Sequence, residues 1–153
     1  PEWSMELFIE ATHIAGCRAI IQTSSANYPE SSQQENIYFI GRHPHQSLFK
    51  HCAAIVHHGG AGTTHSASLC GRPSIVIPFM DEQLFWATTL EQLGLAAKPL
   101  SAKNATATLL ASRIKTILSS NSYLENAKKA GSIISERQGV SNAVDLIEKT
   151  FNY

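Results

Sequence analysis

Two adjacent histidines and the small residues after them form the stretch of this sequence best suited to chemistry. His57 and His58 end an apolar run and lead into Gly59-Gly60-Ala61-Gly62-Thr63-Thr64. Glycines let backbone N–H groups approach an anion, and a helix that begins there directs its positive end at the same point. His58 and the hydroxyls of Thr63 and Thr64 could donate to phosphate oxygens. The pattern predicts a phosphate cradle between a strand and a helix.

Other interpretations of this turn need weighing. The stretch lacks the GK[ST] of a Walker A loop, and the third glycine of a GxGxxG fingerprint would fall on His65. A turn needed only for tight strand–helix packing would explain the glycines but not the histidine pair. Because successive strand residues point to opposite faces, one histidine can be buried while the other faces a ligand. The alternation by itself does not decide which of the two histidines is the buried one.

A metal site is the second alternative, because the chain has 7 histidines. His43 and His45 could converge with His57 or His58 on Zn²⁺. The sequence has no HExxH motif and no Cys/His ligand spacing. We therefore expect neither a metal nor another cofactor.

The composition is that of a globular chain of 153 residues and one domain, 43% hydrophobic and 16% charged. Its 12 basic and 12 acidic side chains cancel, which argues against nucleic acid as a partner. No apolar run is long enough for a transmembrane helix. Cys17, Cys52 and Cys70 are scattered and odd in number, which predicts free thiols and a cytoplasmic location.

Short apolar runs alternate with stretches of helical spacing. This order predicts an α/β fold with a parallel sheet covered by helices on both faces. The expected strands are 17–23, 36–40, 53–57, 74–78 and 95–98, with a surface loop at 24–35. The expected helices are 2–15, 46–51, 63–70, 82–93, one ending at 118 that Asn104 or Thr106 caps, 121–138 and 140–151.

Ligands in such sheets bind beyond the carboxyl ends of the strands. The turns 41–46, 57–64 and 78–83 are expected at that edge. In the last of them, Glu82-Gln83 opens a helix. Spacing alone favours a capping role for Glu82, although the pair also suits the vicinal hydroxyls of a sugar. The His43-Pro44-His45 stretch is either a plain surface turn or a loop that holds a nucleotide base, and composition does not decide between them.

Two runs, HHGGAGTT and GRPSIVIPFMDEQLFWATTLEQLGL, resemble the C-terminal half of GT-B fold glycosyltransferases, above all the sterol glucosyltransferase and UDP-glycosyltransferase family. Pro44-His45, Leu48-Phe49 and Gly139-Val140 extend the resemblance over nearly the whole chain. It implies that residues 1–153 form the Rossmann-like donor-binding domain of a larger two-domain enzyme. It also implies that the central strand preceding the first helix is missing here.

The resemblance carries a set of roles onto this sequence. His58, Gly60, Gly62 and Thr63 match the residues that bind the donor diphosphate. Arg42 and His45 fall at base and ribose positions, and Glu82 and Gln83 at sugar positions. Plant relatives have tryptophan in place of Arg42 and glutamate in place of Ser66, which leaves the choice between UDP and dTDP open.

The implied activity is inverting, metal-independent transfer of a hexose from a nucleoside-diphosphate sugar, UDP-glucose, to a hydroxyl of a lipid, sterol or other small molecule. The catalytic base would come from an N-terminal acceptor-binding domain, in cis or as a partner chain, so no catalytic residue is expected here and the fragment alone should be inactive. A location peripheral to a membrane fits a lipid acceptor. The alternatives are a nucleotide-sugar epimerase of the same fold and a non-catalytic half that works only with a partner chain.

Overall fold

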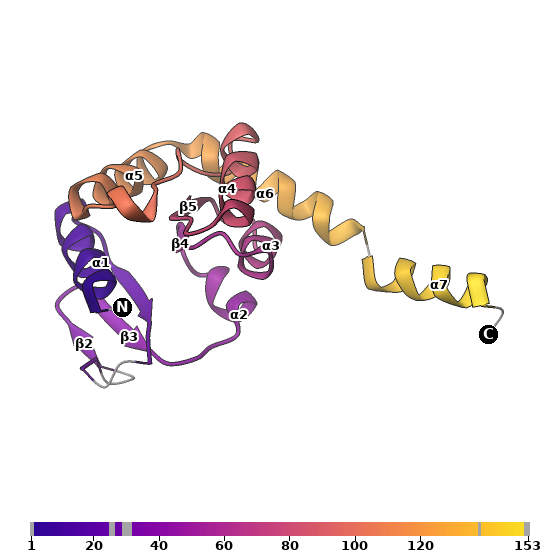
Figure 1. Ribbon diagram of the computed structural model, residues 1–153, viewed down its shortest axis with the longest axis horizontal. Helices are drawn as coiled ribbons and strands as arrows, with labels where there is room; N and C mark the ends of the chain where they lie inside the picture. Colours follow the sequence, from indigo (N-terminus) through magenta and orange to yellow (C-terminus); the bar gives the residue numbers. More distant parts are fainter. Residues whose placement is uncertain (1, 25–26, 29–31, 138, 152–153) are drawn as a thin grey trace.

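The structure, a computed structural model, describes residues 2–24, 27–28, 32–137 and 139–151. Its five strands are short, and its helices form most of the mass (Figure 1). The strands are β1 (Ala19–Gln22), β2 (Gln33–Gln34), β3 (Ile37–Ile40), β4 (Ile55–His57) and β5 (Ser74–Val76). The helices are α1 (Glu2–Ala15), α2 (His45–Phe49), α3 (Ala61–Leu69), α4 (Asp81–Gln92), η1 (Ala102–Asn104, a 3₁₀ turn), α5 (Ala107–Ser119), α6 (Asn121–Glu136) and α7 (Gly139–Phe151).

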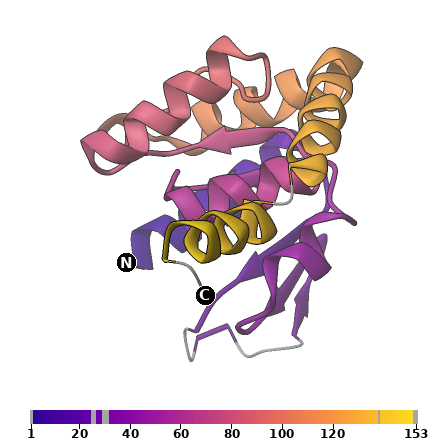
Figure 2. The same cartoon turned by 90° about the vertical axis from the view of Figure 1, so that its right-hand side faces the viewer.

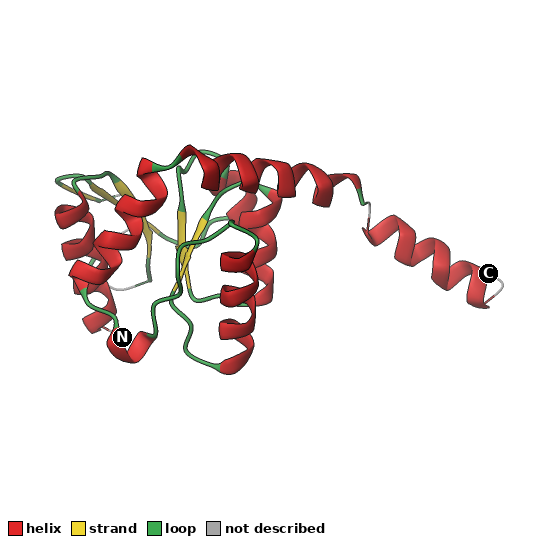
Figure 3. Ribbon diagram, turned by 90° about the horizontal axis from the view of Figure 1, so that it is seen from above, coloured by secondary structure: helices red, strands yellow, loops and turns green. Residues whose placement is uncertain are grey.

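The strands form two separate sheets. β1 pairs with β3 in parallel, and β2 adds an antiparallel edge to β3. β4 pairs with β5 in parallel, with Ile55 opposite Ser74 and His57 opposite Val76. Figure 3 shows helices on both sides of the strands. The predicted α/β fold with parallel strands is confirmed, and the sheet is divided into two parts.

The core lies on both faces of β5. On one face, Ile75 and Ile77 pack with Ala11 of α1 and with the apolar stripe of α5. On the other face, Val76 packs with Ala87 of α4 and Ala127 of α6. This double coverage explains why the strand sequence is a continuous apolar run rather than an alternating one. It anchors the end of β5, and with it the adjoining end of β4.

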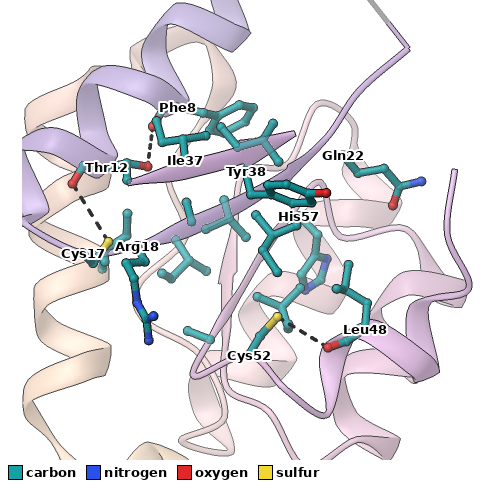
Figure 4. Close-up of a pocket in the computed structure, with 18 of the residues that line it drawn as sticks. Phe8, Thr12, Cys17, Arg18, Gln22, Ile37, Tyr38, Leu48, Cys52 and His57 are labelled. Atoms are coloured by element: carbon teal, nitrogen blue, oxygen red, sulfur yellow. Dashed lines mark hydrogen bonds between the residues drawn. The ribbon is translucent and has the colours of Figure 1, made fainter. Parts of the chain in front are cut away.

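A groove of about 1450 Å³ lies between the two sheets. The edge of β1 lines one wall and the edge of β4 lines the other, and no strand among the described residues pairs with either edge. Figure 4 shows Phe8, Thr12 and Tyr38 on the first wall and Cys52 and His57 on the second.

Several element boundaries differ from those expected. Residues 95–98 form no strand among the described residues; only Ala96 bridges to Ser74. β2 was not expected, because Gln33 and Gln34 show no apolar pattern and are held only by pairing with β3. α3 begins at Ala61, two residues before the expected start. Of the two candidate caps for α5, it is the Thr106 hydroxyl that accepts from the Leu109 N–H at 3.2 Å.

The last helix, α7, extends away from the rest of the chain (Figure 1), and it lies in front of the other elements when the molecule is viewed from that end (Figure 2). All of its residues are exposed, including the apolar Val140, Val144, Ile147 and Phe151. Among the described residues, no helix combines the length and apolar character needed to cross a membrane.

Candidate functional site

The turn between β4 and α3 depends on Gly59. This residue has φ +92°, a conformation that side chains rarely adopt. A Cβ placed there would lie 2.8 Å from Val76 Cγ1 and 2.9 Å from the Gln83 carbonyl oxygen. The backbone of the turn therefore passes between β5 and the start of α4 with no room for a side chain.

His57 lies beneath this turn, and only 9% of it is exposed. Its Nε2 is 3.0 Å from Ser74 Oγ, and its Nδ1 accepts a hydrogen bond of 3.1 Å from the Gly59 N–H. Burial, followed by the nearby charges of His58 and His45, lowers the pKa of His57 from 6.5 to about 4. His57 is thus neutral and internal at neutral pH, whereas His58 is exposed, as the alternation along the strand predicts.

His58 lies against Gly60, the residue that precedes the first turn of α3. A Cβ on Gly60 would come within 2.5 Å of His58 Nε2. No side chain caps this end of the helix, and its first turn contains no acidic residue. The N–H groups of residues 61–63, which have no acceptor inside the helix, therefore open next to an imidazole that can donate a hydrogen bond.

The two threonines of the turn differ in position. Thr63 is half-buried and lines the groove. Thr64 is only 5% exposed, and its Oγ1 has no hydrogen-bond partner among the described residues. The suggestion that both hydroxyls stand beside the phosphate is therefore wrong for Thr64, because the helix turns this side chain inward.

The second turn, from β5 to α4, is built from different types of residue. Phe79 and Met80 are each 58% exposed, and Asp81 and Glu82 occupy the first turn of α4. No side chain caps this helix end either, so the expected capping role of Glu82 is wrong and only its favourable interaction with the helix dipole remains. Gln83 instead reaches back, and its Oε1 accepts from the Phe79 N–H at 2.8 Å.

β3, on the other wall of the groove, leads through exposed Arg42 into α2, which packs against β4 and α3 through Phe49. His45 opens α2, and its ring stacks on Phe49 with centroids 4.8 Å apart. Ser66 donates to the Gly62 carbonyl at 2.9 Å, so its hydroxyl is already engaged within α3. The ring of His45 is held by this stacking contact, whereas the Arg42 side chain is exposed.

The groove brings several of the expected residues together. Arg42, His45, His58 and Thr63 line it. Gly60 and Gly62 lie beside it on the α3 turn, and Glu82 and Gln83 lie at the start of α4. Sequence reasoning missed Ser74, whose signal was a lone polar residue opening an otherwise apolar strand. No group of three or more potential metal ligands occurs among the described side chains.

Residues 15–140 match the family described as "Erythromycin biosynthesis protein CIII-like, C-terminal domain". The match covers most of the sequence, and the chain belongs to this family. It is 29% identical over 154 residues to the sterol 3-beta-glucosyltransferase UGT80B1 of Arabidopsis thaliana, covering 97% of this chain and 24% of that protein. It is also 29% identical over 170 residues to the UDP-sugar-dependent glycosyltransferase 52 of Dictyostelium discoideum, covering 94% of this chain and 10% of that protein.

The fold is also that of solved glycosyltransferases. The crystal structure of glycosyltransferase VinC in complex with dTDP superimposes with a TM-score of 0.78 at 22% identity, over 94% of this chain and 37% of that chain. This likeness establishes the α/β fold of a GT-B C-terminal half. The chain spans about a quarter or less of the two curated relatives.

Proposed function

We propose that residues 1–153 are the donor-binding domain of a larger, two-domain glycosyltransferase. The observation that carries the proposal is the start of α3, where an uncapped helix end without acidic residues lies next to the His58 ring. The reaction would transfer a hexose from a nucleoside-diphosphate sugar to a hydroxyl of a sterol, lipid or other small molecule. The sterol acceptor is suggested by the name of the Arabidopsis relative.

In this proposal, the diphosphate lies against His58, Gly60, Gly62 and Thr63. The leaving diphosphate gains negative charge in the transition state, and fixed N–H dipoles stabilise that charge without reorganising. His58 would add a hydrogen bond to a phosphate oxygen. These groups would serve without a metal ion, and the catalytic base would come from the acceptor-binding domain, which gives an inverting reaction.

The base and the sugar would occupy the two sides of this cradle. Arg42 would stack on the base and His45 would contact the base or ribose, while Glu82 and Gln83 would bind sugar hydroxyls. Gln83 would do so by donation, because its oxygen already accepts from Phe79. We favour UDP-glucose as donor because the Dictyostelium relative is named as UDP-sugar-dependent and the Arabidopsis relative as a glucosyltransferase, although VinC was solved with dTDP. The three free cysteines favour a cytoplasmic enzyme, and a lipid acceptor would fit a location peripheral to a membrane.

The test is calorimetric titration of the full-length protein with UDP, dTDP and GDP, with Gly62→Ala as the diagnostic variant. Apart from its chain neighbours and the backbone of its own helix, a Cβ on Gly62 would meet no atom within 4 Å, so the variant should fold normally. It should bind the preferred nucleotide about tenfold more weakly, because the methyl group occupies the phosphate position. Unchanged affinity would place the diphosphate elsewhere.

The proposal that the reaction needs no metal ion is tested separately. Transfer from UDP-glucose to a sterol should continue at the same rate after treatment with EDTA. Activity that disappears with EDTA and returns with Mg²⁺ would contradict this part of the proposal.

A further inference from the structure

The ring of His57 uses both of its nitrogens inside the protein. Nδ1 faces the Gly59 N–H at 3.1 Å, and Nε2 faces Ser74 Oγ at 3.0 Å. A backbone N–H only donates, so Nδ1 must be unprotonated and Nε2 must carry the proton and donate to Ser74. One neutral tautomer satisfies both contacts. The lowered pKa of this imidazole, caused mainly by burial, keeps the ring neutral at neutral pH.

The contact with Gly59 determines where the turn presents its donors. Gly59 N–H points inward to His57, and Gly59 Cα is confined between Val76 and Gln83. Gly59 is thus a fixed residue in the turn. Before it, the His58 ring lies over Gly60, and after it, the first turn of α3 faces the groove. If Gly59 N–H were released, the peptide between His58 and Gly59 could rotate, and the His58 side chain would move with it.

We propose that His57 is a positioning residue for the donor diphosphate, which holds the Gly59 N–H through Nδ1 while Ser74 fixes the tautomer through Nε2. This inference rests on the proposed function for the identity of the ligand. His57 does not touch the ligand and acts through Gly59 and His58. Its two hydrogen bonds can be separated by mutation, because they leave from different atoms of the ring.

The experiment compares His57→Asn with His57→Gln in the full-length protein. The asparagine Oδ1 takes the place of Nδ1 and can accept from Gly59, but the side chain does not reach Ser74. The glutamine amide reaches the Nε2 position and can donate to Ser74, but it offers Gly59 no acceptor. Each variant keeps one hydrogen bond, so both should lose a similar amount of stability. His65→Gln, at an exposed position of α3, is the control.

We expect His57→Asn to bind UDP within about threefold of the wild type and His57→Gln to bind it about tenfold more weakly. Amide hydrogen exchange at Gly59 should be slow in the wild type and in His57→Asn, and faster in His57→Gln. A purely structural histidine would affect both variants alike. Equal UDP affinity of the two variants, or a Gly59 amide still protected in His57→Gln, would overturn the positioning role.

A measurement on the wild type alone covers the case in which the variants do not fold. ¹⁵N NMR should show His57 with a bare Nδ1 and a protonated Nε2 at pH 7, and a protonated Nδ1 would overturn the inference. If the wild type binds no nucleotide while Gly59 and His57 behave as expected, the proposed function fails and the control of the turn by His57 stands.

Discussion

The β4–α3 and β5–α4 turns have the same architecture and opposite chemistry. Each leaves a parallel strand and enters a helix whose first turn no side chain caps. The first is built from glycines beside His58 and has no acidic residue. The second contains Phe79 and Met80 and places Asp81 and Glu82 on the helix. Both helix N-termini carry a positive dipole end, but only the first suits an added anion, since the first turn of the second helix already contains two carboxylates.

The two turns are also linked through Gly59, which gives the largest predicted effect. Gly59→Ala should lower the free energy of unfolding by about 2–4 kcal/mol, from the positive φ and from the clashes with Val76 and Gln83. Chemical denaturation measures this. Gly62→Ala is the matched control and should instead stabilise the protein by up to about 1 kcal/mol, because the helix gains alanine at an open position. Equal effects would show that the first turn is not confined as described.

The next largest predicted effect is the pH dependence of stability that arises from the buried His57. In the folded protein the pKa of His57 is about 4, against 6.5 for an ordinary histidine. Between these values the unfolded chain binds more protons, so stability rises with pH. The contribution of neutral His57 to the free energy of unfolding should be complete above pH 6.5. It should fall by on the order of 3 kcal/mol as the pH approaches 4. His57→Asn, measured in parallel by denaturation, should lack this component. Parallel curves for the two proteins would contradict it.

Ligand binding should distinguish the two turns directly. His58→Ala should weaken UDP and UDP-glucose alike, by about tenfold to a hundredfold, because both carry the diphosphate. Glu82→Ala should leave UDP unchanged and weaken UDP-glucose by about tenfold, because only the sugar reaches the second turn. Calorimetry with both ligands on both variants makes the comparison. A loss of UDP affinity in Glu82→Ala would contradict the assignment of the diphosphate to the first turn and of the sugar to the second.

The smallest effect lies inside the first turn. Thr64→Val removes a buried hydroxyl that has no hydrogen-bond partner in the described part of the chain, and it should stabilise the protein by about 1 kcal/mol with UDP affinity unchanged. Thr63→Val is its neighbour in the groove and should weaken UDP binding without stabilising the fold. Thermal unfolding and calorimetry measure both. Reversed results would mean that Thr64, and not Thr63, faces the ligand.

Much of the local structure around the candidate site could be predicted from the order of the residues. The run IVHHGG specifies a strand that ends in a turn, and Thr106 was a recognisable helix cap that the structure confirms. Local rules suffice there, because the relevant contacts lie within four residues along the chain. The alternation of His57 and His58 between buried and exposed positions follows from strand geometry in the same way.

The tertiary structure decided what those side chains do. Ser74 lies 17 positions from His57 in the sequence, so no local pattern pairs them. The need for glycine at position 59 comes from Val76 and Gln83, which reach the turn only after β5 and α4 have packed. Gln83 was assigned to a sugar by resemblance, and the fold turned its oxygen toward the Phe79 N–H. The sequence by itself determined where the chain turns and which chemical groups are available. Long-range packing determined which of those groups are free to meet a ligand, because burial and hydrogen bonding between distant segments are settled only once the segments meet.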